Sequence, residues 1–342
     1  MNRWLLSLCV VLVLSVAAVY LFIPARIEVS KVVAVKCNVD AAARVLADSG
    51  RWNAWWPGGG TERSAVAGAT EGSTGVGAAE GSAGVGAAEH DRDGHPVYAY
   101  ENDRYAVLQR LRRSSAVMID GDGLRSPSML VAIPHRGVDS CFLQWSFERH
   151  TSRNPIARLK DYWAAKRVHA AMGVILDGLR HYLETDSLLY GFPITPSRVS
   201  DTLVVETGRK EAAYPATADI YSVVQQLEGF VKGYGGKVVG HPIMNVTHDS
   251  GRYLLRVAIP VDRRGGAESG FLYRYMPKMA LFLQADVHGG EWSVRHGLQQ
   301  MENYISDHQK TRMAIPFLSL ITDRRVEPDT LKWVTRIDYP FF

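Results

Sequence analysis

Hydrophobic and polar positions alternate over short segments in the first half of the chain and then change to a helical period. Strand-like alternation covers residues 27–38 and segments near 97–108, 110–119, 128–134 and 138–148. From 156 to about 184, apolar residues recur at helical spacing: Val168, Met172, Ile175, Leu179 and Tyr182. This order predicts an opening strand, short helices, an antiparallel meander and one long helix.

The pattern in the second half occurs twice, each time as a strand, a helix and two further strands. The first copy has a strand near 201–209, a helix near 217–234 and a hairpin over 238–246 and 253–261. The second copy has the corresponding segments near 278–288, 292–309, 315–322 and 332–341. Two similar units joined head to tail predict a pseudo-twofold domain with a ligand cleft at their junction.

Residues 4–23 carry no charge, and a helix of this length spans about 30 Å, the thickness of the hydrocarbon core of a bilayer. The bulky residues before Pro24 make a poor cleavage site, so a cleaved signal peptide is disfavoured. We therefore expect residues 1–26 to form a single-pass anchor in the inner (cytoplasmic) membrane, with the following domains outside the cytoplasm.

The remaining chain is predicted to hold a domain over 27–185, a proline-punctuated linker over 186–200 and a domain over 201–342. Inside the first domain, residues 61–94 are rich in Gly, Ala, Ser and Glu, and a nine-residue sequence that starts at Glu71 is nearly repeated from Glu80. Two copies cannot build a stacked repeat core. We expect a surface insertion whose deletion leaves the fold intact.

Composition mainly excludes functions. The 342 residues include 39 Lys and Arg against 35 Asp and Glu, and the net charge of +4 is too small to indicate nucleic-acid binding. Of the three cysteines, only Cys37 and Cys141 could form a bridge. Both lie in strand-like segments of the first expected domain, and buried free thiols are favoured. No zinc-ligand spacing or catalytic motif is present, so no metal, cofactor or catalytic residue is predicted.

Three tryptophans, Trp52, Trp55 and Trp56, precede Pro57. With the opening strand and Val39-Asp40-Ala41, this segment resembles the START-like superfamily, also called SRPBCC or polyketide cyclase-like proteins, over roughly residues 27–185. The resemblance implies a helix-grip fold with an apolar cavity between the sheet and the terminal helix. The three tryptophans are candidate ligand-binding residues at its mouth, and packing anchors are the alternative.

Several motifs in the second domain resemble the GyrI-like, or AraC-type effector-binding, small-molecule-binding domain. They are Tyr275-Met276-Pro277, His288-Gly289-Gly290-Glu291-Trp292, Ile315-Pro316-Phe317 and the ending from Glu327 to Pro340. The resemblance implies a ligand cleft between the two halves. The residues that it places there are Tyr273, Tyr275, Trp292, Phe317, Leu318, Leu320 and Trp333.

Leu318 and Leu320 depart from the family pattern. Members of the family that bind cations carry a glutamate and a tyrosine at these positions, and a buried carboxylate is what balances a desolvated cation. We therefore expect an apolar or neutral ligand in this cleft.

The predicted fold class is α+β: an N-terminal transmembrane helix, a helix-grip domain and a duplicated β-α-β-β domain. The predicted function is a membrane-anchored small-molecule-binding protein that senses or sequesters its ligand, without nucleic acid as a partner. Two alternatives stay open. One is a cyclase- or hydrolase-type enzyme that uses either cavity, and the other is an effector-responsive regulator that acts through a partner protein.

Overall fold

Two antiparallel sheets, one of seven strands and one of eight, form the framework of the chain. The computed structural model describes residues 3–58, 89–121, 124–198, 203–266, 268, 270–276 and 281–341. The chain divides into two compact units that meet in sequence between Thr185 and Asp186. The α+β class is confirmed.

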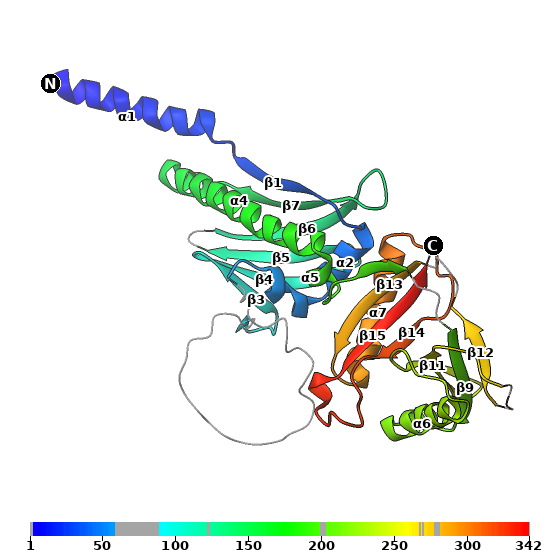
Figure 1. Cartoon of the computed structure of the whole chain (residues 1–342). Helices are drawn as coiled ribbons and strands as arrows, with labels where there is room; N and C mark the ends of the chain where they lie inside the picture. Colours follow the sequence, from blue (N-terminus) through cyan, green and yellow to red (C-terminus); the bar gives the residue numbers. More distant parts are fainter. Residues whose placement is uncertain are drawn as a thin grey trace, which may run out of the picture. The chain divides into compact units, whose positions relative to one another are not determined.

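The first unit holds the sheet β1-β7-β6-β5-β4-β3-β2, and Figure 1 shows the long helix α4 lying along one face of it. Its helices are α1 (Arg3–Phe22), α2 (Val39–Ala47), α3 (Trp52–Trp55) and α4 (Pro155–Glu184), with a 3-10 turn at Ser49–Arg51. Its strands are β1 (Arg26–Val35), β2 (Glu89–His90), β3 (Pro96–Tyr100), β4 (Asp103–Leu111), β5 (Ser114–Gly121), β6 (Leu124–Pro134) and β7 (Cys141–His150).

Strand alternation decides which side chains enter the core of this unit. In β7 the buried residues are Cys141, Leu143, Trp145 and Phe147, as the sequence predicts. Cys37 and Cys141 are both buried free thiols, and burial raises the pKa of Cys141 to about 11.

The helix α4 begins with a cap that its sequence specifies. The Asn154 side-chain oxygen accepts a hydrogen bond from the Ile156 amide at 2.9 Å, and Pro155 occupies the first helical turn, where a missing N–H costs nothing. The predicted terminal helix is thus present at nearly the expected bounds.

The predicted membrane anchor at residues 4–23 is wrong. A helix that crosses a bilayer needs about 20 consecutive, predominantly apolar residues, and within the described ranges no helix combines the necessary length and apolarity. The placement of the chain as a single-pass inner-membrane protein is overturned with it. At the end of α1, the Arg158 guanidinium donates hydrogen bonds to the Ile23 carbonyl, which joins this end to α4.

The second unit holds the sheet β12-β9-β11-β10-β14-β15-β13-β8. Its strands are β8 (Thr195–Arg198), β9 (Leu203–Glu211), β10 (Ile243–Asp249), β11 (Arg252–Val261), β12 (Leu272–Tyr275), β13 (Leu281–His288), β14 (Phe317–Leu320) and β15 (Val334–Phe341). Its helices are α5 (Asp186–Leu189), α6 (Thr217–Gly233) and α7 (Glu291–Asp307), with a 3-10 turn at Thr330–Lys332.

The two halves of this unit repeat the order strand, helix, strand, strand: β9-α6-β10-β11 and β13-α7-β14-β15. The halves join through β10 and β14, where Met244 lies opposite Leu318. Helix α6 contacts β9 and β11, and α7 contacts β13 and β15. Gly297 allows the close approach of α7, because a Cβ there would lie 2.8 Å from Val287 Cγ2.

The two predicted connecting segments are the insertion over 61–94 and the linker over 186–200. Of the insertion expected over 61–94, residues 61–88 lie outside the described residues, and β2 occupies Glu89–His90 at the edge of the first sheet. The segment expected as a linker, 186–200, contains α5 and β8, and β8 pairs with β13.

Candidate functional site

The three tryptophans expected at a cavity mouth lie inside the first unit. Trp52, Trp55 and Trp56 are 0%, 4% and 5% exposed. They form an aromatic stack with three rings from later strands, and the ring centroids of neighbours lie 5.0–6.5 Å apart. The rings that complete the stack are Tyr98, Tyr105 and Trp145. These buried positions are those expected in the alternative interpretation, in which the tryptophans are packing anchors.

Only some of the indole N–H and hydroxyl groups of the stack have hydrogen-bond partners. Trp145 Nε1 donates to Ser128 Oγ at 2.9 Å, and Trp56 Nε1 donates to the Ala99 carbonyl at 2.9 Å. Trp55 Nε1 and the Tyr105 hydroxyl are buried without a hydrogen-bond partner. Burial raises the pKa of Tyr105, so its hydroxyl stays protonated. Nothing in this stack supplies a charge for catalysis.

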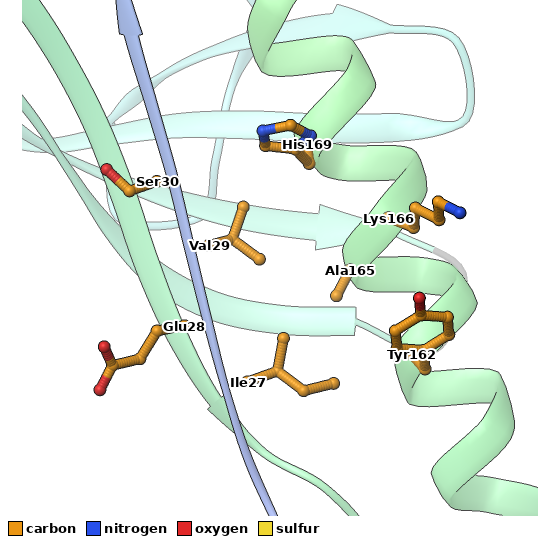
Figure 2. Close-up of a pocket in the computed structure, with 8 residues that line it drawn as sticks. All are labelled: Ile27, Glu28, Val29, Ser30, Tyr162, Ala165, Lys166 and His169. Atoms are coloured by element: carbon orange, nitrogen blue, oxygen red, sulfur yellow. The ribbon is translucent and has the colours of Figure 1, made fainter. Parts of the chain in front are cut away.

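A groove of about 240 Å³ lies between β1 and α4 of the first unit. Figure 2 shows Ile27 and Val29 between the strand and the helix, with Tyr162, Lys166 and His169 along α4. Drug-sized ligands usually occupy pockets of about 300–1,000 Å³. The groove is below that range.

Asp91, Asp93 and His95 could offer ligand atoms to a metal within 4.8 Å of one another. The Asp91 carboxylate, however, accepts hydrogen bonds from the Asp93 and His95 amides and lies 3.1 Å from His95 Nδ1. These bonds close the turn before β3, which explains the cluster without a metal.

In the second unit, three tyrosines of the first half lie near the junction of the halves. Tyr214 precedes α6, Tyr221 lies in α6, and Tyr253 lies at the start of β11. The rings of Tyr214 and Tyr253 meet edge to face with centroids 5.7 Å apart. Tyr214 is 37% exposed, so part of this aromatic surface faces solvent.

The second half contributes a cation and its supports. The Arg324 guanidinium lies 4.6 Å from the centroid of the Trp333 ring and donates from Nη2 to Thr335 Oγ1 at 2.8 Å. The Arg324 amide donates to the Tyr221 hydroxyl at 2.9 Å, which joins the two halves at this point. We call this group the Arg324 site: Tyr214, Tyr221, Tyr253, Arg324, Trp333 and Thr335.

Neighbouring arginines differ sharply in their partners. Arg325 forms ion pairs with Asp323 at 2.8 Å and with Glu228 at 3.2 Å. Arg324 is partly buried, yet no carboxylate in the described parts of the chain forms an ion pair with it. Asp323, the acid next to Arg324 in sequence, is therefore engaged by Arg325, and Glu327 accepts a hydrogen bond from the Asp329 amide.

The pKa shifts reflect this difference. Burial lowers the pKa of Arg324, an effect that Tyr221 and Tyr214 partly oppose, whereas the hydrogen bonds that Arg325 donates to Asp323 and Glu228 raise the pKa of Arg325. Burial and the charge of Glu291 raise the pKa of Tyr214, and the charges of Arg295 and Arg324 act in the opposite direction. Arg324 remains a cation at neutral pH, so the site contains a partly desolvated positive charge.

The residues predicted for the cleft are spread over several elements of the second unit. Trp333 belongs to the Arg324 site, and Leu320 lies beside it because it pairs with Thr335. Leu318 is buried opposite Ile337, under α7. Phe317 lies on the other face of the sheet, with its ring 5.6 Å from Phe282.

The other three predicted cleft residues lie on β12 and at the start of α7. Tyr273 and Tyr275 are on the edge strand β12, where the Tyr273 hydroxyl accepts from the Gly265 amide at 2.8 Å. Trp292, in the first turn of α7, is 62% exposed and stacks on His296.

Sequence reasoning missed Arg324 and the three tyrosines. None of the motifs that carry the resemblance includes Arg324. The available signal was the pair of adjacent arginines, Arg324-Arg325, between the acids Asp323 and Glu327.

Two acids of the second unit could have balanced a bound cation. Glu291 forms an ion pair with Arg295 on the same helix. Asp338 is buried, and burial raises its pKa while its side chain accepts hydrogen bonds from Gln284 and Ser319. Since Asp338 pairs with Phe317, it lies on the sheet face away from α7. Neither acid supplies a free carboxylate to the Arg324 site.

No family model matches the chain, and no curated protein matches its sequence. Among solved structures, the EcmrR C-terminal domain covers 44% of this chain and 98% of its own at 14% identity and a TM-score of 0.39. SAV2435, solved with tetraphenylphosphonium, covers 44% and 94% at 12% identity and a TM-score of 0.29. A START superfamily protein from Mycobacterium smegmatis covers 46% and 97% at 15% identity and a TM-score of 0.27. At these sequence identities and TM-scores, the similarities indicate nothing about what this chain binds.

Proposed function

We propose that the chain is a small-molecule-binding protein whose second unit holds its ligand at the Arg324 site, to sense or sequester it. The observation that carries this proposal is the joining of both halves around one partly buried guanidinium. The guanidinium lies over the Trp333 ring, the Tyr221 hydroxyl accepts from the Arg324 amide, and Tyr214 is partly exposed. Apolar and aromatic walls around a few placed polar groups are typical of ligand sites.

The ligand class excluded by this proposal is the organic cation. Leu318 and Leu320 are buried and apolar, and Arg324 places a positive charge at the site. The Glu291 carboxylate, whose charge acts on Tyr214, is paired with Arg295. A cation would meet repulsion from Arg324 in addition to its loss of hydration. The proposed function therefore keeps the expectation from the sequence that the ligand is not a cation.

Native mass spectrometry and titration calorimetry on the full chain test the proposal. We expect a non-covalent small-molecule adduct, or binding of 2-naphthamide as an aromatic probe, in the wild type. Tyr214→Ala should weaken this binding at least fivefold, since it removes the exposed ring of the site.

Tyr162→Ala, in the groove of Figure 2, is the matched control and should leave the binding unchanged. Binding that is lost in Tyr162→Ala and retained in Tyr214→Ala would place the ligand in the first unit and refute the proposal.

A further inference from the structure

The Arg324 guanidinium has unused hydrogen-bonding capacity. A guanidinium carries five N–H donors in a planar fork. Within the described residues, the side chain donates one hydrogen bond, from Nη2 to Thr335 Oγ1 at 2.8 Å. The remaining donors are held in place, because the group also stacks on Trp333.

No carboxylate of the described residues forms an ion pair with Arg324. Asp323 and Glu228 are bound by Arg325, and Glu291 is bound by Arg295. The Glu327 carboxylate accepts a hydrogen bond from the Asp329 amide. Each of these acids would have to give up its own partner to reach Arg324. A partly buried cation without a counterion is stabilised by any anion that enters the site.

We propose that the ligand of the second unit is a small organic acid, whose carboxylate binds to Arg324 and whose apolar or aromatic body contacts Tyr214 and Tyr253. This inference rests on the proposed function and sharpens it, because it gives the polar end of the ligand a charge. The planar fork of arginine matches a carboxylate with two parallel, charge-assisted hydrogen bonds.

The inference also refines the expectation of a neutral ligand. That expectation follows from Leu318 and Leu320, which lack the carboxylate that a cation needs. The same two leucines are consistent with the apolar body of an acid. The sign of the charge is set by Arg324, which no sequence motif identified.

Titration calorimetry of the full chain with two matched probes tests the inference. The probes are 2-naphthoate and 2-naphthamide, which share a ring system and differ in charge. We expect wild-type protein to bind the naphthoate at least tenfold more tightly, equivalent to about 1.4 kcal/mol. Arg324→Gln should bind both probes within a factor of two of each other and keep the affinity for the amide.

Arg312→Gln is the matched control, because it removes another guanidinium of the second unit, one that pairs with Glu302 at 3.2 Å and lies beside the opposite end of β15. It should keep the tenfold preference. Arg324→Lys keeps the charge without the fork and should show an intermediate preference, so it serves as the second variant if Arg324→Gln does not fold.

The outcomes separate the two proposals. Equal binding of both probes by the wild type, or an unchanged preference in Arg324→Gln, would overturn the anionic ligand and leave a neutral-ligand site in place. Binding of neither probe, together with no adduct in the mass spectrum, would overturn the proposed function itself.

Discussion

Six aromatic rings in the first unit are each 5% exposed or less, whereas Tyr214 at the Arg324 site is 37% exposed. The first group contains only neutral polar tips, which can be buried at moderate cost. The second surrounds a guanidinium without a counterion, and a cation of that kind cannot be fully desolvated cheaply. The comparison teaches that the charge, rather than the number of aromatic rings, separates a closed core from a candidate binding site in this chain.

The largest expected difference in stability between the two units comes from removing one tryptophan from each. Trp52 is fully buried in the stack, so Trp52→Ala should lower the free energy of unfolding of the first unit by about 3–5 kcal/mol. Trp292 is 62% exposed, and Trp292→Ala should change stability by no more than about 0.5 kcal/mol. Urea unfolding followed by circular dichroism measures both values. Similar effects of the two variants would contradict the contrast.

Two glycines of α4 test how closely the stack is packed. A Cβ on Gly178 would lie 2.7 Å from the carbonyl oxygen of Trp55, so Gly178→Ala must displace α3. We expect the overpacking cost of about 1–3 kcal/mol to exceed the gain of about 1 kcal/mol in helix propensity. The thermal unfolding midpoint should therefore fall.

Gly173→Ala is the control on the same helix. Its Cβ would lie 3.5 Å from the end of the flexible Lys31 side chain, so the gain in helix propensity should raise the midpoint. If both alanines stabilise the protein, α3 is not held tightly against α4.

Much of the framework could be predicted from periodicity. The helices expected over 217–234 and 292–309 are found at Thr217–Gly233 and Glu291–Asp307. Alternation also identified the buried face of β7. These features depend on neighbours a few residues apart, which a hydrophobic pattern reports directly.

The features that the sequence pattern does not report are contacts between distant segments. Trp56 is buried because Tyr98, Tyr105 and Trp145 arrive from later strands, and no local pattern reports that the opposite space is filled. The Arg324 site likewise depends on a contact with Tyr221, 103 residues earlier. In the first helix, apolar composition suggested a membrane span that the described structure does not support.

The smallest effects concern one hydroxyl in each aromatic group. The Tyr105 hydroxyl is buried without a partner, so Tyr105→Phe removes an unsatisfied group and should be neutral or stabilise the first unit by up to about 1 kcal/mol. The Tyr221 hydroxyl accepts from the Arg324 amide and donates to the Thr322 carbonyl at 3.3 Å. Tyr221→Phe should destabilise the second unit by about 0.5–1.5 kcal/mol.

The sign of the Tyr105→Phe effect decides how the stack is to be understood. Urea unfolding of the two variants, each against the wild type, measures it. A destabilising Tyr105→Phe would mean that the hydroxyl is satisfied by an internal water, and such a water needs both space and polar partners. The first unit would then contain a hydrated interior next to Trp55 Nε1, the other unpartnered donor of the stack. In that case the contrast between a closed first unit and a ligand-binding second unit would fail, and the first unit would become a second candidate for the ligand.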